Sequence, residues 1–429
     1  MDVPRYIALL IILPCLFACY PKDRKNWISA WKAASPLQQA RSGFALAQSG
    51  PWLYIAGGVD GKDFLRSTEY ARLMPGGGLG PWKKGPDMQQ ARGFFAMTAH
   101  KGFLYAVGGG QGPSGSQLLA SVERAPIAAD GQPGAWENLT QNLVIPRRCA
   151  RLAIVGDRLL AIGGFGGISL DSVESARLGL NGELSNWQLH PKNMDIPRYV
   201  HAVAAQTGRI FVLGGHAQKK GTGLTEVSWS ADGQMWHTGA ALQQGRYGLS
   251  AVTYQQRIYA FGGMSGAKFL DTTEQADIRA TGTSAWHMGT PLPMALAEFG
   301  AWVDSDQVFI IGGTHRDGYN REVFYANFNT NGDIGFLGHE NEIAHPTKIT
   351  QTDLPLQGQV VDVLQTDSYI FLNLRANDTQ WWIATQGVAP KKGDFIRHGR
   401  GITMRDFFSK SANRTFAEII FTSRAEKLP

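Results

Sequence analysis

Apolar runs that end in a pair of glycines recur along most of the chain. Each run, such as LYIAGG or VFIIGG, is apolar at consecutive positions, which is typical of a strand buried on both faces. The six pairs are Gly57-Gly58, Gly108-Gly109, Gly163-Gly164, Gly214-Gly215, Gly262-Gly263 and Gly312-Gly313. Their spacings of 51, 55, 51, 48 and 50 residues indicate a repeat architecture.

Two further markers keep the register of the glycine pairs. An arginine stands 16 residues before the first glycine in five repeats, where the sixth has Leu296. These arginines are Arg41, Arg92, Arg147, Arg198 and Arg246. A tryptophan follows the pair in five repeats, where the sixth has Phe336 in the phrase NGDIGF. These tryptophans are Trp82, Trp136, Trp187, Trp236 and Trp286.

Each repeat has the pattern of four short strands. A run of small residues leads to the glycine-pair strand, and an alternating strand such as SVESARL follows a polar loop. A turn such as ADGQ or LNGE then leads to the tryptophan strand. Four strands in about 50 residues are typical of a β-propeller blade, and stacked blades bury the faces that one blade cannot bury alone. We therefore predict an all-β, six-bladed propeller over residues 41–347.

The glycine pairs, the later tryptophan and phrases such as Ala-Asp-Gly-Gln resemble the kelch family, and in particular its bacterial secreted type. The resemblance implies a propeller fold, with the glycines allowing close backbone approach near the centre. It also implies that each tryptophan fills the wedge between neighbouring blades.

The segment before the first repeat resembles the last strand of a blade. Trp31 precedes Arg41 by 10 residues, as Trp82 precedes Arg92. Within residues 19–40, Asn26 to Ser35 is therefore expected to pair with the final blade and close the ring. The strand around Phe336 competes for the same place, so one of the two is redundant or the final blade carries five strands.

Residues 1–18 have the pattern of an export signal. One arginine precedes a thirteen-residue apolar stretch, which is too short to span a membrane and suits a signal peptide. Leu16-Phe17-Ala18-Cys19 resembles a bacterial lipobox, although an ordinary signal peptide remains the alternative. The resemblance implies lipidation of Cys19 and anchoring to the outer membrane, facing the periplasm or the cell surface. Cys149, the remaining cysteine of the mature chain, is expected to be buried and unreactive.

The glycine-pair register stops at about Thr350, and residues 348–429 form a different domain. Segments such as SYIFLNLR and QWWIATQ alternate in polarity as short strands do. This part resembles small OB-like β-barrel domains of accessory proteins of periplasmic nitrite reduction. The matching positions include Trp382, Met404, Phe407, Arg414 and Phe416. The resemblance implies a fold and no specific activity.

Composition and charge exclude only a few classes of protein and partner. The chain of 429 residues has 52 glycines, 43% hydrophobic residues and 18% charged residues, which excludes a disordered or coiled-coil chain. The net charge of +6 includes no lysine or arginine run, so we expect no nucleic-acid partner.

Motifs for known chemistry are scarce. GQGPSG at residues 110–115 matches G-x-G-x-x-G but lacks a following helical pattern, so it does not indicate dinucleotide binding. A copper radical oxidase is disfavoured because Cys149 lies in a strand pattern. We expect no cofactor and no metal site.

The arginine register provides the main binding hypothesis. Each arginine begins the innermost strand and the glycine pair ends the next, so both points lie at the same face of an antiparallel pair. The arginines would then surround one mouth of the axial channel and attract carboxylates. Residues of the adjoining loops complete the candidate ligand site, namely His216, Glu298, His315 and Arg316, with Asp60 and Phe165 beside them. The alternative is that the arginines only cap backbone carbonyls.

Two functions fit these observations, and the sequence favours the first, with the second as its alternative. The first is a lipid-anchored, non-catalytic scaffold that recognises a protein, an anionic glycan or a peptide at the propeller mouth. The second is a carbohydrate-active enzyme, because some bacterial kelch propellers interconvert the anomers of sialic acid. Arginine with Glu298 or a histidine would suit acid–base chemistry on a carboxylated sugar.

Overall fold

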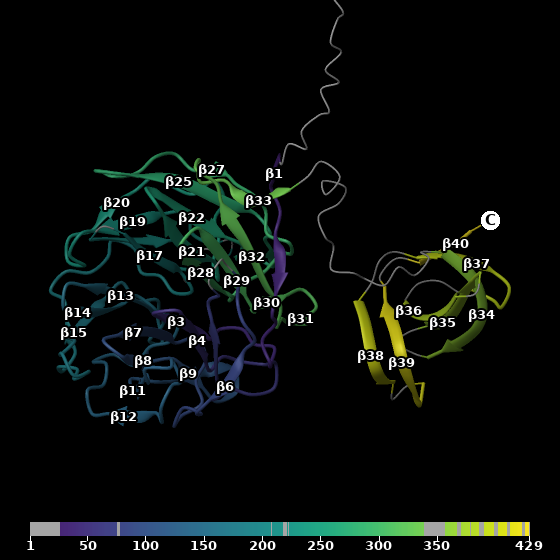
Figure 1. Cartoon of the computed structure of the whole chain (residues 1–429), viewed down its shortest axis with the longest axis horizontal. Helices are drawn as coiled ribbons and strands as arrows, with labels where there is room; N and C mark the ends of the chain where they lie inside the picture. The colour runs from purple at the N-terminus through teal and green to yellow at the C-terminus, as the bar shows by residue number, and fades with distance from the viewer. Residues whose placement is uncertain are drawn as a thin grey trace, which may run out of the picture. The chain divides into compact units, whose positions relative to one another are not determined.

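The computed structural model describes residues 26–428 except for 75–77, 207, 218–220, 222, 339–356, 367–369, 378, 386–389, 399–401, 410–411 and 423–424. The chain divides into two compact units, Met1–Ala344 and His345–Pro429. The first unit contains six antiparallel sheets, one for each predicted repeat, which we call blades 1 to 6. Figure 1 shows their first strands toward the middle of this unit and their later strands toward its periphery.

Blades 1 to 3 each contain four strands in chain order. Blade 1 contains β3 (Ala45–Ser49), β4 (Trp52–Ala56), β5 (Thr68–Arg72) and β6 (Lys83–Gly85). Blade 2 contains β7 (Ala96–His100), β8 (Phe103–Val107), β11 (Val122–Pro126) and β12 (Glu137–Leu139). Blade 3 contains β13 (Arg151–Val155), β14 (Arg158–Ile162), β15 (Val173–Arg177) and β16 (Gln188–Leu189).

Blades 4 to 6 follow the same order. Blade 4 contains β17 (Ala202–Gln206), β18 (Arg209–Leu213), β19 (Val227–Ser230) and β20 (His237–Thr238). Blade 5 contains β21 (Ser250–Tyr254), β22 (Arg257–Phe261), β25 (Thr273–Arg279), β26 (Gly282–Thr283) and β27 (His287–Met288). Blade 6 contains β28 (Gly300–Asp304), β29 (Gln307–Ile311), β32 (Val323–Phe328) and β33 (Ile334–Gly338).

Short hairpins extend the loops that follow three of the glycine pairs. They are β9 (Gly110–Gln111) with β10 (Gln117–Leu118), β23 (Met264–Ser265) with β24 (Lys268–Phe269), and β30 (Thr314–His315) with β31 (Gly318–Tyr319). The GQGPSG segment belongs to the first hairpin, where Pro113–Gly115 forms a single 3-10 turn. It therefore leads into no helix that could receive a phosphate, which agrees with the sequence interpretation.

The glycine pairs join neighbouring blades. The second glycine of each pair donates its N–H to the carbonyl of the residue at the arginine position of the next blade, for example Gly58 to Arg92 at 2.9 Å. The last bond runs from Gly313 of blade 6 to Arg41 of blade 1 at 2.8 Å and closes the ring. Gly58 has a φ of +97°, and a Cβ there would lie 2.7 Å from the Ser42 carbonyl oxygen. The joint therefore needs glycine for both its conformation and its space.

The hydrophobic core lies between neighbouring blades, with one cluster at each of the six interfaces. Each cluster includes a tryptophan, as the sequence predicted for the wedge between blades. Five of these are the predicted repeat tryptophans, and Trp236 is the one that is only partly buried.

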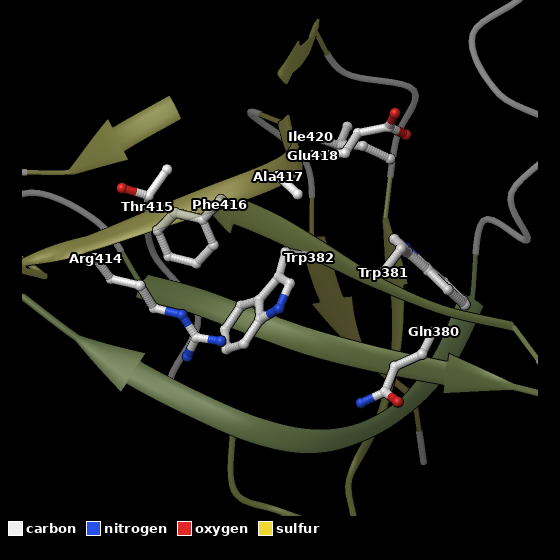
Figure 2. A pocket seen from close by; sticks show the side chains of 9 residues that line it. All are labelled: Gln380, Trp381, Trp382, Arg414, Thr415, Phe416, Ala417, Glu418 and Ile420. Carbon is white, nitrogen blue, oxygen red and sulfur yellow. The ribbon is translucent and has the colours of Figure 1, made fainter. Parts of the chain in front are cut away.

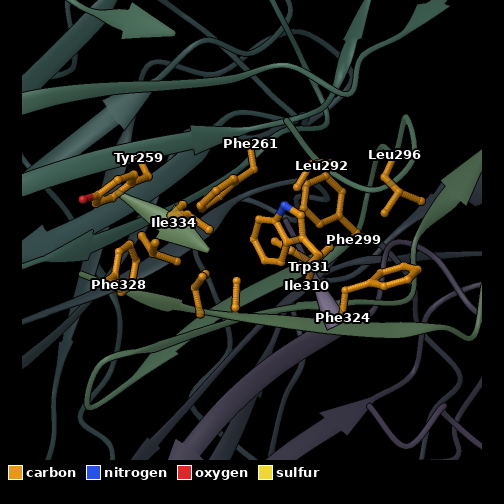
Figure 3. Packing of buried hydrophobic residues seen from close by; sticks show 13 residues of the cluster. Trp31, Tyr259, Phe261, Leu292, Leu296, Phe299, Ile310, Phe324, Phe328 and Ile334 are labelled. Atoms are coloured by element: carbon orange, nitrogen blue, oxygen red, sulfur yellow. The ribbon is translucent and has the colours of Figure 1, made fainter. Parts of the chain in front are cut away.

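The sixth tryptophan is Trp31 rather than a residue of the sixth repeat. Trp31 is 6% exposed, packs edge-on against Phe261 at 6.2 Å and donates from Nε1 to the Pro291 carbonyl at 2.8 Å. Figure 3 shows its indole between Phe261, Leu292 and Phe299. Phe336, which matches the tryptophan phrase in sequence, is only partly buried and lies beneath the ammonium of Lys32. The wedge position is therefore filled from the N-terminal end of the chain.

Both candidate closing segments, the N-terminal one and the one around Phe336, pair with strands of blade 6. β2 (Lys32–Ala34) pairs with β32 at Tyr325, Phe324 and Val323. β33 pairs with the end of the same strand, at Asn327 and Phe328, and β1 (Asn26–Ile28) pairs in turn with β33. The final blade therefore holds strands from both ends of the propeller, which corresponds to the alternative of an enlarged last blade.

The second unit contains one mixed sheet in the order β38-β39-β36-β35-β34-β37-β40. Its strands are β34 (Gln357–Gln365), β35 (Ile370–Ala376), β36 (Thr379–Thr385), β37 (Phe395–His398), β38 (Ile402–Ser409), β39 (Arg414–Phe421) and β40 (Ala425–Lys427). Residues on its two faces form separate apolar clusters, around Trp381 and around Phe371. The sheet agrees with the predicted strands, and the OB-like barrel stays a prediction.

The close packing around the glycine pairs predicts that alanine destabilises the protein more at Gly58 than at Gly167. Gly58 and Gly167 have nearly the same φ, +97° and +98°, but nothing lies within 4 Å of a Cβ at Gly167. Gly167→Ala should lower the free energy of unfolding by about 1–2 kcal/mol, the usual cost of a left-handed residue. Gly58→Ala should cost at least twice as much because the Ser42 backbone must also move. Urea unfolding of the two variants measures the difference, and equal losses would contradict the joint.

Candidate functional site

The five register arginines are buried clamps within their blades. All five are 0% exposed, so the structure does not place them as a ring at the channel mouth. In each, Nη1 donates to the carbonyl of the first glycine of its own blade, at 2.9 to 3.1 Å. The capping alternative of the sequence analysis therefore describes them, and their guanidinium groups are not available to a ligand.

A buried glutamate neutralises four of these arginines. The pairs are Arg41–Glu69 at 2.8 Å, Arg92–Glu123 at 2.6 Å, Arg147–Glu174 at 2.5 Å and Arg246–Glu274 at 2.6 Å. Each glutamate also accepts backbone N–H groups from the segment before the arginine, for example Gln89 and Gln90 at Glu123. Such bonding is what allows an ion pair to persist away from water.

Two blades depart from this arrangement. In blade 4 the Ser228 hydroxyl accepts from Arg198, and burial lowers the pKa of that arginine to about 10. In blade 6 Leu296 and Phe324 replace arginine and glutamate together. There the Asn320 amide donates to the Gly312 carbonyl at 3.2 Å and so replaces the arginine donor.

The residue two positions after each arginine, or after Leu296, has a left-handed backbone. The φ values are +58° at Gly43, +54° at Phe94, +56° at Cys149, +48° at Val200, +64° at Gly248 and +53° at Glu298. Five N–H groups of this set donate to the carbonyl of the equivalent residue in the preceding blade, among them Glu298 to Gly248 at 2.8 Å and Gly43 to Glu298 at 3.0 Å. We call these six residues the axial ring.

Glu298 is the acidic member of the axial ring. Its side chain is partly exposed, and the structure shows no hydrogen bond or ion pair to its carboxyl group from the described residues. Burial raises the pKa of Glu298, while Arg151 and Arg148 lower it. Both arginines belong to blade 3, which lies opposite blade 6 in a ring of six.

An arc of aromatic and basic side chains extends from Arg148 over blades 3 to 5. The Arg148 guanidinium lies over the Phe165 ring at 5.2 Å, and Phe165 contacts Tyr199 at 5.3 Å. His216 then lies between Tyr199 and Tyr247, at 5.3 Å and 5.2 Å. These five residues are partly exposed. Together with Glu298 and Arg151 we call them the mouth cluster.

The arc is asymmetric around the ring. Its residues occupy two repeated positions, one directly after the arginine and one directly after the glycine pair, which bridge each other in every blade. In blades 1, 2 and 6 these positions hold only small or aliphatic residues, namely Ser42, Val59, Gly93, Gly110, Ala297 and Thr314. Because the blade scaffold is the same throughout, the concentration of aromatic and basic groups on three blades marks a candidate ligand site.

The tyrosines and Cys149 of this region are held in their neutral forms. Burial raises the pKa of Tyr247, with Glu298 as the second cause, and burial also raises the pKa of Tyr199. Cys149 is 4% exposed, and burial raises the pKa of its thiol to about 12. The prediction of a buried cysteine is confirmed, although Cys149 lies just before β13 rather than inside a strand, and its lack of reactivity stays a prediction.

The remaining predicted residues lie apart from one another. His216 and Phe165 belong to the mouth cluster, whereas His315 and Arg316 lie on the β30–β31 hairpin of blade 6. His315 Nδ1 accepts the Asp317 N–H at 3.2 Å, and Arg316 is exposed. The Asp60 carboxylate accepts the N–H groups of Lys62 and Asp63 and so stabilises its own loop.

Sequence reasoning missed Arg148, Arg151, Tyr199 and Tyr247. A signal for them exists in the repeats themselves, because equivalent positions elsewhere hold serine, glycine or alanine. In the third repeat, RRCAR adds two arginines to the one that the register requires. Departures from the repeat, rather than its shared residues, identify the candidate site.

The described residues contain no group of three or more histidine, cysteine, aspartate or glutamate side chains placed to hold a metal ion. In the same part of the chain, no helix has the length and hydrophobicity needed to cross a membrane. Cys19, the predicted lipidation site, lies outside the described residues.

The buried arginine–glutamate pairs predict that removing the arginine alone lowers the free energy of unfolding more than removing both charged residues. Arg92→Leu leaves Glu123 buried without its cation and should lower the free energy of unfolding by about 3–5 kcal/mol. Adding Glu123→Phe recreates the Leu296–Phe324 pair of blade 6 and should recover part of that loss. Urea unfolding measures both variants, with Arg66→Leu at an exposed ion pair as the control expected to lose less than about 1 kcal/mol. A double variant less stable than the single one would refute this account.

Comparison with known proteins supports the repeat assignment. A family model described as Kelch motif matches residues 245–293. Kelch-like protein 35 of Mus musculus is 27% identical over 140 residues, and Kelch-like protein 26 of Danio rerio is 26% identical over 224 residues. These alignments cover 33% and 51% of this chain but only 23% and 35% of the two relatives. A solved structure titled "Structure of YjhT" matches with a TM-score of 0.58 and 12% identity, over 71% of this chain and 99% of that one. Residues 245–293 therefore match a kelch motif, and the sheets of the first unit are consistent with the blades of a kelch propeller.

Proposed function

We propose that the mouth cluster binds a carboxylated sugar of the sialic-acid type and interconverts its anomers. The observation that carries this proposal is the carboxyl group of Glu298, which lies in the axial ring without a hydrogen-bonding partner among the described residues, on the blade opposite the one that contains Arg148 and Arg151. The resemblance to bacterial kelch propellers that interconvert sialic-acid anomers supports the same choice.

Arg148 and Arg151 are suited to hold the carboxylate of such a sugar. Arg148 is positioned by its stacking on Phe165 and by donation from Nη1 to the Ser114 carbonyl at 2.6 Å. Neither arginine has an ion pair among the described residues. A guanidinium without an internal acid binds a carboxylate through charge-assisted hydrogen bonds. Tyr199 and His216 offer ring faces against which the sugar can pack.

Glu298 is suited to the proton transfer that opens the sugar ring. Its carboxylate takes the proton of the anomeric hydroxyl while the ring oxygen receives a proton and the bond between that oxygen and the anomeric carbon breaks. Tyr199, which burial keeps protonated by raising its pKa, is the candidate donor. Reclosure reverses these transfers on either face of the carbonyl, so no atom is gained or lost and no cofactor is required.

A non-catalytic scaffold accounts for fewer features of the mouth cluster than the proposed enzyme does. A surface that only binds a protein needs complementary shape and charge, but it does not need an acid of raised pKa at the axis. Turnover separates the two functions, because a scaffold would bind the sugar or a partner without accelerating exchange between anomers.

Glu298→Gln should abolish catalysis and preserve binding. The amide keeps the size of the side chain but cannot accept the proton, so the rate of anomer exchange of N-acetylneuraminic acid should fall at least about a hundredfold. Two-dimensional exchange NMR measures the rate, and calorimetry measures binding. Glu322→Gln is the matched control, because Glu322 is an exposed acid of the same blade. Full activity in Glu298→Gln would exclude Glu298 as the base, and a wild-type chain that binds without exchange would favour the scaffold.

The pH profile provides a second readout of the same residue. Because burial raises the pKa of Glu298, its carboxylate form is present only above that raised value. The exchange rate should therefore increase with pH through a midpoint higher than that of an ordinary glutamate, and Glu298→Gln should lose this step.

We also propose export of the chain and lipid attachment at Cys19, with the propeller facing the periplasm or the cell surface. The support is the apolar stretch before Cys19 and the lipobox-like phrase. Cells expressing the full chain should yield a membrane-associated protein whose mature N-terminus is a lipidated Cys19, as measured by intact mass. Cys19→Ser should lack the lipid mass. An unmodified N-terminus at another residue in the wild type would refute the anchor.

A further inference from the structure

The C-terminal unit has a cavity where two of its strands separate. β36 and β39 are parallel and pair only at Trp382–Ile419, Ile383–Ile420 and Ala384–Phe421. Before these three pairs the two strands diverge, and a cavity of about 470 Å³ opens between them. Its lining comes from Gln380 to Trp382 on one strand and from Arg414 to Glu418 and Ile420 on the other. This volume lies within the usual range for small-molecule sites.

Three side chains on one side of the cavity form a basic and aromatic surface. The Arg414 guanidinium lies over the Trp382 ring at 4.5 Å and over the Phe416 ring at 5.4 Å. Trp382 and Phe416 meet edge to face at 5.2 Å, and Phe416 stacks on the buried ring of Phe371 at 5.1 Å. Figure 2 shows the three side chains together beside the diverging strands. We call Trp382, Arg414 and Phe416 the platform.

The platform carries a positive charge that the described residues do not neutralise. Arg414 is exposed, and no ion pair or hydrogen bond from its guanidinium occurs among those residues. Glu418, the acid that lines the same cavity, points away from Arg414 (Figure 2). Stacking on two rings restricts the guanidinium before any ligand arrives, so less conformational entropy is lost when it binds an anion.

Around the platform, the lining combines buried apolar side chains, among them Trp381 and Ile420, with exposed polar ones. Gln380 is exposed and offers an amide group, whereas Trp382 is only half-buried. An aromatic face packs against the C–H face of a sugar ring, polar side chains bond its hydroxyl groups, and arginine binds a carboxylate. A purely apolar ligand would leave Arg414 without a partner, and a neutral sugar would leave it equally unused.

We propose that the platform is a second ligand site of this protein, specific for a carboxylated sugar residue and not catalytic. Arg414 binds the carboxylate, Trp382 packs against the sugar ring, and Gln380 bonds its hydroxyl groups. Phe416, which is 2% exposed, supports Arg414 from beneath. The cavity contains no acid–base pair like that of the mouth cluster. The platform consists of residues of the C-terminal unit alone, so this site does not depend on the function proposed for the propeller.

Titration of the full chain with glucuronic acid and with N-acetylneuraminic acid tests the platform. Calorimetry or ligand-observed NMR on an Arg148→Ala, Arg151→Ala background, which removes the carboxylate contacts proposed for the mouth cluster, follows binding at the platform as each platform variant is added. Arg414→Ala should weaken binding at the platform by at least about tenfold, the usual effect of losing a charge-assisted hydrogen bond. Arg414→Lys, which keeps the charge but not the planar fork, should weaken it less. Glucose should bind as weakly as the acids bind to Arg414→Ala.

Matched variants separate the possible outcomes. Arg375→Ala removes another exposed arginine of the same unit that does not line the cavity, and it should leave binding unchanged. Gln380→Ala should weaken binding modestly while retaining the fold, which thermal unfolding checks for every variant. Equal affinity in Arg414→Ala and in its parent would overturn the site, even if the mouth cluster proves active. Binding of an acidic peptide but of no sugar, with the same dependence on Arg414, would overturn the ligand class.

Discussion

The propeller depends on one repeated backbone contact, in which the second glycine of each pair donates its N–H to the carbonyl at the arginine position of the next blade. At Gly57, the first glycine of the pair, a Cβ would lie 2.4 Å from the Arg92 carbonyl oxygen of the next blade, so a larger residue would force the two blades apart. The bond from Gly313 to Arg41 completes the circuit. Because the interblade cores and the axial ring are all placed by this contact, the spacing of the glycine pairs determines the rest of the first unit.

The arginines stabilise this joint from inside the blade. Their side chains satisfy the carbonyl of the first glycine, and a glutamate in the same blade balances the charge in four cases. Blade 6 achieves the same result with Leu296, Phe324 and the Asn320 amide. An apolar pair that substitutes for a buried ion pair is consistent with the high desolvation cost of such pairs. The conserved charge pattern among repeats is therefore structural.

Much of the fold could be predicted from the sequence because the repeat markers are local and periodic. The position of Trp31 ten residues before Arg41 indicated its part in the closing blade. The repeat spacing could not decide where the arginine side chains lie. Arginines that surround the channel mouth and arginines buried within their blades would recur at the same spacing in the sequence. The deciding partner of Arg41 is Glu69, 28 residues later on a different strand. The repeat pattern also gave a wrong expectation at Phe336. Its sequence context NGDIGF matches the tryptophan position of the repeat, but Trp31 occupies the space between blades 5 and 6.

In a repeat protein, the residues that depart from the shared pattern are the ones the scaffold does not require. Phe94, Cys149, Val200 and Glu298 adopt a left-handed backbone at a ring position where two blades use glycine, and such strain is retained only where the surrounding structure enforces it. Glu298 also belongs to the blade that has lost its arginine clamp. Its cations are therefore those of the opposite blade, Arg148 and Arg151. In the proposed function, a ligand whose carboxylate binds those arginines would extend across the axis toward Glu298, and the departures in blades 3 and 6 would then act on the same molecule.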